Sequence, residues 1–325
     1  MPNAVTAAFG LMGGLAMFLY AMTTMTAALE KAAGAGMRRV LAAMTGTPLL
    51  AALSGAVVTA VLQSSSAATV TVIGFVGAGL MDLPQAVAVI FGANIGTTVT
   101  AQLLAFPLGD VRYPLLFLGF AVYFLAVGDR VKSGGLALFS FGLLLEGIEL
   151  MSRAMAPLAE SPAFLWMMGH VAHRPGLGML LGAVMTVIVQ SSSASVAVLQ
   201  RFAAQTGSAM GLGGAVPILL GCNMGTTVTA LIAAVGQARD AKRTALAHCV
   251  FNVTGSAVIL LMLPLFTRLV VRLSPAAPVA RQIANAHTLF NVICTLLWLP
   301  MTGLMVKLVT RLIPEKRASP EKDIS

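Results

Sequence analysis

A short run of amide and hydroxyl side chains occurs twice in this chain, each time inside an apolar stretch. Residues 63–67 have the sequence Gln-Ser-Ser-Ser-Ala, and residues 190–194 repeat it exactly in order. Serine and glutamine both donate and accept hydrogen bonds, so such a run can bind an oxyanion or a small cation. Unpaired polar groups are costly in hydrocarbon, which means that these side chains need partners. The two copies, called here the serine motifs, therefore predict a binding site.

A second polar motif follows each serine motif by about thirty residues. Residues 92–100 are Gly-Ala-Asn-Ile-Gly-Thr-Thr-Val-Thr, and residues 221–229 are Gly-Cys-Asn-Met-Gly-Thr-Thr-Val-Thr. Their Asn and Thr side chains supply further oxygens, and we expect both helices to unwind at the glycines so that the backbone approaches a ligand. These asparagine–threonine motifs and the serine motifs contain no Asp or Glu. A divalent anion would therefore meet no repelling charge.

The elements that hold these motifs are predicted to be membrane helices. Apolar residues make up 58% of the chain and charged residues 10%, with a mean hydropathy of +0.91. A soluble protein has about a quarter charged residues. Residues 9–29, 245–266 and 283–304 are each long enough to cross a hydrocarbon core of roughly 30 Å. We predict an all-α polytopic membrane protein, and the lack of strand-like alternation argues against an outer-membrane barrel.

The repeated motifs divide the chain into two similar halves. We predict a first repeat over residues 1–133, a second over residues 134–310 with extra C-terminal helices, and a charged cytoplasmic tail over residues 311–325. In each half the span with the serine motif (49–80 and 176–204) should be broken or re-entrant in its middle. The first half then has an odd number of other crossings, so the repeats should have inverted topology. Inverted repeats with broken helices are typical of secondary transporters.

The basic residues indicate an orientation rather than a nucleic-acid partner. The formal net charge is +9, but Lys and Arg occur in short loops, without a basic patch interleaved with aromatic residues. Placing the loop at residues 30–48 in the cytoplasm puts most of them on that side, as the positive-inside rule expects. We predict a multi-pass protein of a bacterial cytoplasmic (inner) membrane with a cytoplasmic C-terminus.

Other polar residues within apolar segments are interpreted as structural rather than as ligand-binding. A third repeat, His-x-x-Phe-Asn at residues 248–252 and again at residues 287–291, is interpreted as polar packing between helices. Glu146 and Glu149 lie inside a span and are functional candidates, although their position near its polar end favours a structural role. His170 and His173 lack a third ligand, so no metal other than sodium is predicted.

The serine and asparagine–threonine motifs resemble those of the sodium–phosphate cotransporter family, its type II members and their bacterial relatives. The resemblance covers about residues 5–305. It implies Na⁺-coupled uptake of inorganic phosphate by alternating access across the lipid bilayer, with Na⁺ co-transported. Whether the protein forms a homodimer is left open. We assign phosphate to Ser64, Ser65, Ser66, Ser191, Ser192 and Ser193. We assign sodium to Gln63, Gln190, Asn94, Thr97, Asn223 and Thr226.

Three alternatives differ from this prediction. The transporter can carry another oxyanion, such as sulfate or arsenate, or it can be an H⁺-driven phosphate exporter. An intramembrane serine protease would use one serine with His248 or His287 as its base. No Gly-x-Ser-x-Gly elbow surrounds the serines, and a duplicated nucleophile has no catalytic purpose. A membrane scaffold would need none of the serines. We therefore predict no enzyme activity.

Overall fold

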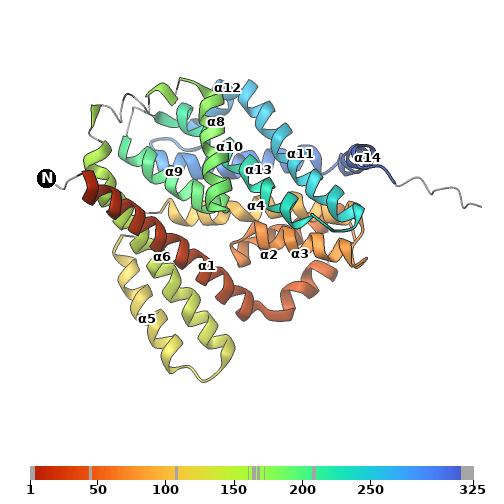
Figure 1. Cartoon of the computed structure of the whole chain (residues 1–325), viewed down its shortest axis with the longest axis horizontal. Helices are drawn as coiled ribbons and strands as arrows, with labels where there is room; N and C mark the ends of the chain where they lie inside the picture. The colour runs from red at the N-terminus through yellow and green to blue at the C-terminus, as the bar shows by residue number, and fades with distance from the viewer. Residues whose placement is uncertain are drawn as a thin grey trace, which may run out of the picture.

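The computed structural model describes residues 4–43, 46–106, 109–159, 161–162, 166, 169–171, 173–206 and 210–315. Within these ranges the chain is helical and contains no strand, which confirms the all-α prediction. The elements, labelled in Figure 1 where there is room, are α1 (Ala4–Ala43), α2 (Pro48–Leu62), α3 (Ser65–Gly77), α4 (Leu83–Leu104), η1 (Gly109–Val111), α5 (Arg112–Leu125), α6 (Asp129–Ala159), α8 (Pro175–Val189), α9 (Ser192–Thr206), α10 (Gly211–Ala233), α11 (Arg239–Leu261), α12 (Leu263–Leu273), α13 (Val279–Trp298) and α14 (Thr302–Leu312).

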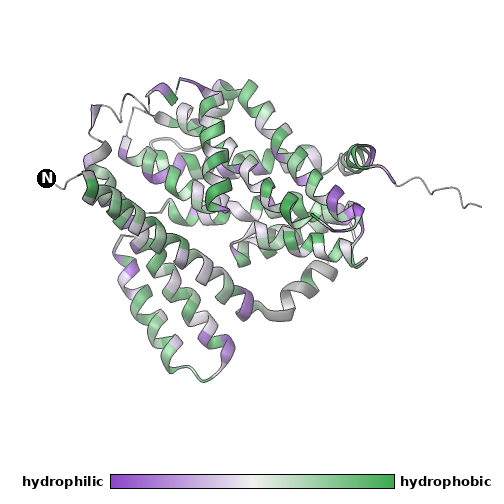
Figure 2. Cartoon of the chain, in the orientation of Figure 1, coloured by the Kyte–Doolittle hydropathy of each residue, from purple (hydrophilic) through white to green (hydrophobic). Residues whose placement is uncertain are grey.

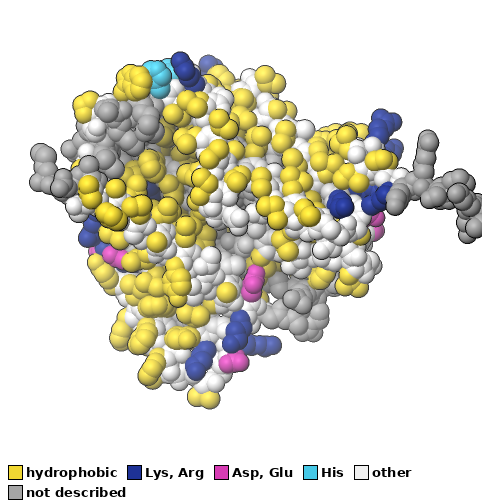
Figure 3. Space-filling model, viewed as in Figure 1, with side chains coloured by type: hydrophobic (Ala, Val, Ile, Leu, Met, Phe, Trp, Pro, Cys, Tyr) yellow, Lys and Arg dark blue, Asp and Glu magenta, His cyan; other side chains and the backbone are white. Residues whose placement is uncertain are grey.

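Several of these helices are long and apolar enough to cross a membrane. In the described part of the chain, five meet this criterion singly: the main parts of α1 and α6, and all of α4, α10 and α11. The consecutive helices α13 and α14 meet it together but are bent by 84° at their junction. Figure 2 shows the apolar residues distributed over all parts of the fold, and Figure 3 shows them covering most of the visible face. The protein is thus a polytopic helical membrane protein.

Both serine motifs interrupt their helices, as predicted. The first separates α2 from α3, and the second separates α8 from α9. Each resulting helix has only 13 to 15 residues. At 1.5 Å per residue such a helix is shorter than the roughly 30 Å hydrocarbon core, so each pair is a broken span or a re-entrant hairpin.

The breaks predicted at the glycines of the asparagine–threonine motifs are wrong, because α4 and α10 are continuous helices. The glycines instead allow two helices to touch. A Cβ on Gly92 would overlap the backbone carbonyl of Ala52 on α2, and Gly96 meets α2 one turn further along. Gly221 and Gly225 of α10 lie in the same way against the backbone of α8. Small residues permit such close approach between membrane helices.

Two predicted spans near the C-terminus also end differently. Residues 245–266 were expected to form one helix, but α11 ends at Leu261 and α12 begins at Leu263, with Pro264 in its first turn. Residues 283–304 include the bend between α13 and α14, where Pro300 lies between the two helices. Proline cannot donate its backbone nitrogen to a helix and is tolerated at a helix start, which explains both positions. The tail predicted at 311–325 begins inside α14, and residues 316–325 lie outside the described part.

The helices pack as two connected groups (Figure 1). Helices α1 and α6 lie side by side, with α5 against α6 on the lower side of the view. In the other group, α4 contacts α2 and α13, α10 contacts α8, and α11 contacts both α3 and α4. Helix α9 touches α6 and α4 and thus joins the groups. Helices from both halves of the sequence therefore contact α4 and α9.

Candidate functional site

The two serine motifs form the same backbone break. Gln63 ends α2 with φ 56° and ψ 22°, and Gln190 ends α8 with φ 56° and ψ 21°. This is the left-handed region, which residues other than glycine seldom occupy. Each glutamine N–H still bonds back to a threonine carbonyl, of Thr59 in the first copy and Thr186 in the second. The glutamine therefore stops one helix and redirects the chain into the next.

The first serine of each motif caps the helix that follows. The Ser64 hydroxyl accepts a hydrogen bond from the Ala67 N–H at 3.1 Å, and the Ser191 hydroxyl accepts one from the Ala194 N–H at 3.2 Å. A serine cap satisfies one of the N–H groups that a helix start leaves free. Other N–H groups of the first turn stay available, together with the positive end of the helix dipole. Such a helix start suits an anion.

The remaining serines are mostly shielded from the surface. Ser65, Ser192 and Ser193 are buried, whereas Ser66 is half-buried. The Ser66 hydroxyl lies 3.4 Å from that of Thr229, which belongs to the second asparagine–threonine motif on α10. This contact joins polar motifs that are 163 residues apart in the sequence. The fold thus brings the first serine motif against the second half of the chain.

Gln63 lies beside a cavity within the first half. Its Oε1 accepts a hydrogen bond from the Thr100 hydroxyl at 2.7 Å, which connects the two motifs of that half. Both residues line a cavity of about 370 Å³, whose other walls are apolar residues of α1, α2, α4 and α6. In the second half the equivalent Gln190 is exposed, and the equivalent Thr229 contacts Ser66 instead. The two copies share a backbone but differ in their side-chain partners.

The asparagines of the other motifs contact the third repeat. His248 Nε2 lies 3.4 Å from Asn94 Oδ1, and Asn252 Nδ2 donates to the same oxygen, also at 3.4 Å. In the second copy, His287 Nε2 lies 3.1 Å from Asn223 Oδ1. Since an amide oxygen only accepts, the histidine Nε2 atoms are the donors. These are the polar helix contacts expected of the third repeat, but their partners are residues assigned to the sodium site.

Several atoms of these two clusters have no hydrogen-bond partner within the described part of the chain. In each cluster the free atoms include the histidine Nδ1, on His248 and His287, and the Oδ1 of Asn252 and Asn291. Buried polar atoms are nearly always paired, so unpaired acceptors in two equivalent places indicate room for a donor or a cation. Sequence reasoning missed this proximity to Asn94 and Asn223. The signal was the duplication of His-x-x-Phe-Asn itself.

The threonines assigned to sodium bond within their own helices. Thr97 Oγ1 donates to the Ala93 carbonyl and Thr226 Oγ1 to the Cys222 carbonyl, both at 3.0 Å. Both side chains are buried. A hydroxyl that donates in this way keeps its lone pairs, which can coordinate a cation. Their assignment to sodium stays a prediction, like that of phosphate to the serines.

The two intramembrane glutamates have a partner on the neighbouring helix. Arg112 of α5 lies 2.7 Å from Glu146 and 3.8 Å from Glu149, and Arg153 also contacts Glu149 at 2.9 Å. The Arg112 side chain is 8% exposed. These ion pairs hold α5 against α6, which agrees with the structural role that sequence position favoured.

A helical bundle with several candidate membrane spans and two equivalent polar breaks defines the class: a multi-span membrane protein. The chain belongs to the Na⁺/Pi-cotransporter family, whose model matches residues 17–153 and 143–298. The overlapping matches, one per half, agree with the internal repeat.

Named relatives include bacterial and mammalian proteins. The uncharacterized protein YqeW of Bacillus subtilis is 36% identical over 79% of this chain and 83% of its own length. The protein named "Putative inorganic phosphate export protein YjbB" of Escherichia coli is 27% identical over 81% of this chain, which spans about half of that relative (48%). The mouse sodium-dependent phosphate transport protein 2A is 38% identical over 41% of this chain and 20% of its own length. No solved structure matches.

Proposed function

We propose that the protein is a Na⁺-coupled secondary active symporter that takes up inorganic phosphate by alternating access. One observation carries this proposal: the same left-handed glutamine and serine-capped helix start occurs in both halves. Two helix starts with serine hydroxyls offer donors to an oxyanion without any carboxylate in the motifs. The family supplies the substrate class, and the name of the mouse relative includes sodium dependence.

In this proposal the serines and the other motifs have separate roles. Phosphate binds the serine hydroxyls and first-turn N–H groups, through Ser64, Ser65, Ser66, Ser191, Ser192 and Ser193. Sodium binds the amide and hydroxyl oxygens of Gln63, Gln190, Asn94, Thr97, Asn223 and Thr226. A cation beside a buried anion offsets part of the desolvation cost of both, which makes their binding interdependent. The unpaired acceptors around Asn94 and Asn223 support a cation in this region.

Alternating access follows if the halves are inverted repeats in unlike conformations. The first half has the Thr100–Gln63 contact, whereas in the second half Thr229 contacts Ser66 of the opposite half. We propose that the opposite state exchanges these pairings, so that Thr229 contacts Gln190 and Thr100 contacts Ser193. The protein would lie in a bacterial inner membrane with its C-terminus in the cytoplasm.

Export is the second candidate, because the name of the Escherichia coli relative includes phosphate export. Purified protein in liposomes separates the two. Uptake of labelled phosphate should require an inward Na⁺ gradient and should be lost when a proton gradient replaces it. Phosphate movement driven by the proton gradient alone would contradict sodium symport and favour the exporter. Competition by unlabelled sulfate and arsenate would identify the oxyanion that the site prefers.

A further inference from the structure

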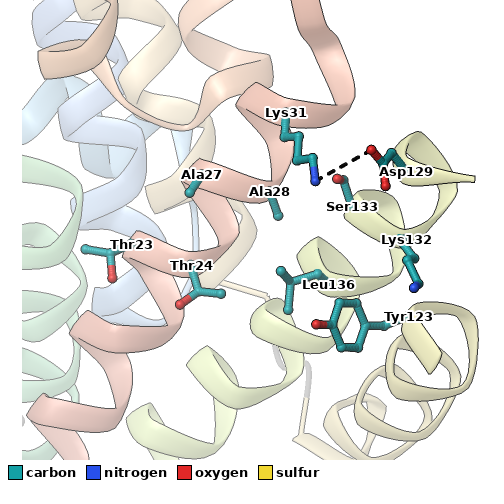
Figure 4. A pocket seen from close by; sticks show the side chains of 10 residues that line it. All are labelled: Thr23, Thr24, Ala27, Ala28, Lys31, Tyr123, Asp129, Lys132, Ser133 and Leu136. Carbon is teal, nitrogen blue, oxygen red and sulfur yellow. Dashed lines mark ion pairs between the residues drawn. The ribbon is translucent and has the colours of Figure 1, made fainter.

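A hollow separate from the serine motifs lies between α1, α5 and α6 (Figure 4). Its volume is about 600 Å³. Residues of three helices line it: Thr23, Thr24, Ala27, Ala28 and Lys31 of α1, Tyr123 of α5, and Asp129, Lys132, Ser133 and Leu136 of α6. Neither the sequence motifs nor the proposed transport cycle uses these residues.

The hollow has a positive charge balance. Lys31 reaches from α1 toward Asp129 of α6, with Nζ 4.0 Å from Oδ2 (Figure 4). Both side chains are well exposed, at 65% and 83%, and such a pair is weak in water. Within the described part of the chain, Lys132 has no acidic partner within 4.0 Å. The hollow therefore has two ammonium groups and one carboxylate, which pairs weakly with Lys31 alone, so that Lys132 is available to bind an anion.

The other lining groups combine hydrogen bonding with apolar surface. Thr24, Ser133 and the Tyr123 phenol supply hydroxyls, and Ser133 is buried. Ala28 and Leu136 form an apolar wall. A hollow that combines cations and hydroxyls with aliphatic groups matches a molecule that has an anionic head and a hydrocarbon tail.

Its position in the fold points to the membrane surface. Lys31 lies two residues before the end of the candidate span Val5–Ala33, and Asp129 begins the candidate span Asp129–Pro157. At the end of α5, close in sequence to Tyr123, Phe124 and Leu125 are exposed. Tyrosine and lysine are common where membrane helices meet the headgroup region. The cationic side of the hollow is therefore at headgroup depth, with apolar surface beside it.

We propose that this hollow binds the phosphate group of an anionic phospholipid, held between Lys31 and Lys132. The hydroxyls of Ser133 and Tyr123 bind the phosphate oxygens, and the acyl chains lie along the exposed side chains of α5. Basic pockets between membrane helices bind lipid headgroups in this manner on the cytoplasmic side. The chemistry of the site is that of a phosphate ester, and free phosphate shares part of it.

The test uses the full-length protein in neutral detergent micelles, with phosphatidylglycerol added in increasing amounts. Binding is followed by the thermal stabilisation that the lipid produces and by native mass spectrometry. The double variant K31Q/K132Q should bind phosphatidylglycerol about 30-fold more weakly, since each lysine near an anionic headgroup contributes about fivefold. The control R268Q/R272Q removes two exposed charges from α12 and should keep the wild-type affinity.

Three further measurements distinguish the sources of the phosphate group. Phosphatidylcholine should stabilise wild type and K31Q/K132Q equally. Inorganic phosphate should not displace the lipid, and any stabilisation that it produces should survive in K31Q/K132Q, because it comes from the serine motifs. Unchanged phosphatidylglycerol binding in K31Q/K132Q would overturn the proposal. Inorganic phosphate binding that is lost in K31Q/K132Q would assign the hollow to free phosphate and overturn the lipid.

Discussion

At the scale of single residues, the serines that follow the two caps are proposed to bind the ligand with hydroxyls that no cap uses. Ser64 and Ser191 already bond to the backbone of their own helices, whereas Ser65 and Ser192 lie next in sequence and are buried. In the proposed transporter their hydroxyls face a charged oxyanion. A hydrogen bond to a charged group contributes about 1.5–3 kcal/mol, so its loss is measurable.

The S65A and S192A variants should therefore each raise the phosphate concentration for half-maximal uptake by about tenfold or more. The measurement is Na⁺-driven uptake of labelled phosphate in liposomes, with the amount of inserted protein held equal. Ser152→Ala is the matched control: within the described residues its hydroxyl bonds only to the Ile148 carbonyl on α6, so uptake should not change. Normal uptake in S65A and S192A would favour the scaffold hypothesis.

The two buried histidines allow a test of transport against proteolysis. Both hypotheses predict damage when His248 or His287 becomes alanine, because the structure bonds them to Asn94 and Asn223. A glutamine substitution distinguishes the two hypotheses, since the glutamine amide donates to the asparagine oxygen but cannot act as a base. H248Q and H287Q should keep most of the uptake, while H248A and H287A should lose about tenfold, because each alanine removes the histidine hydrogen bond to a buried asparagine oxygen. Equal loss in the glutamine and alanine variants would contradict this role as donor.

At the scale of helices, the close contact of α2 with α4 depends on glycine. Gly92→Ala should lower the free energy of unfolding by about 1–3 kcal/mol, because its Cβ would overlap the Ala52 carbonyl and neither backbone can move freely. Thermal unfolding in detergent measures the change. Gly74→Ala on α3 is the control, since its Cβ would meet nothing within 4 Å and alanine favours a helix. A fully stable G92A would mean that α2 and α4 can separate at little cost.

Particular residues explain which elements were predictable from the sequence. The helix breaks at the serine motifs were predicted correctly, because a Gln and three Ser inside apolar sequence indicate locally where one helix ends and the next begins. The serine cap confirms this. The predicted breaks at Gly92 and Gly221 were wrong, because a glycine in a helix can mark either an unwound turn or a close contact with another helix. Only the position of the partner helix shows which of the two occurs. The contacts of His248 and His287 with asparagines were missed because residues 154 and 64 positions apart share no local pattern.

At the scale of the whole molecule, the halves are interlocked rather than separate. Helix α13 of the second half packs on α4 of the first, and α11 packs on α3 and α4. The contact between Ser66 and Thr229 lies in this shared interior. Motion of one half against the other must therefore change that contact, which makes it a marker of conformational state.

A cysteine pair at residues 66 and 229 should report this state. In a background without native cysteines, S66C/T229C should cross-link readily, since the two hydroxyls are 3.4 Å apart, and oxidation should then stop phosphate uptake. Reduction should restore uptake. The pair T100C/S193C, at the equivalent positions, should cross-link only in the opposite state. Full transport by the oxidised S66C/T229C protein would contradict an exchange of pairings.

The matching left-handed glutamines also bear on the origin of the chain. A conformation that non-glycine residues avoid occurs at the same place in both halves, with ψ differing by 1°. Separate origins of this left-handed glutamine in the two halves require more events than descent of both halves from one gene. Descent of both halves from one gene would place the bend before their duplication. Two copies of such a half would then have to associate before the paired motifs could meet.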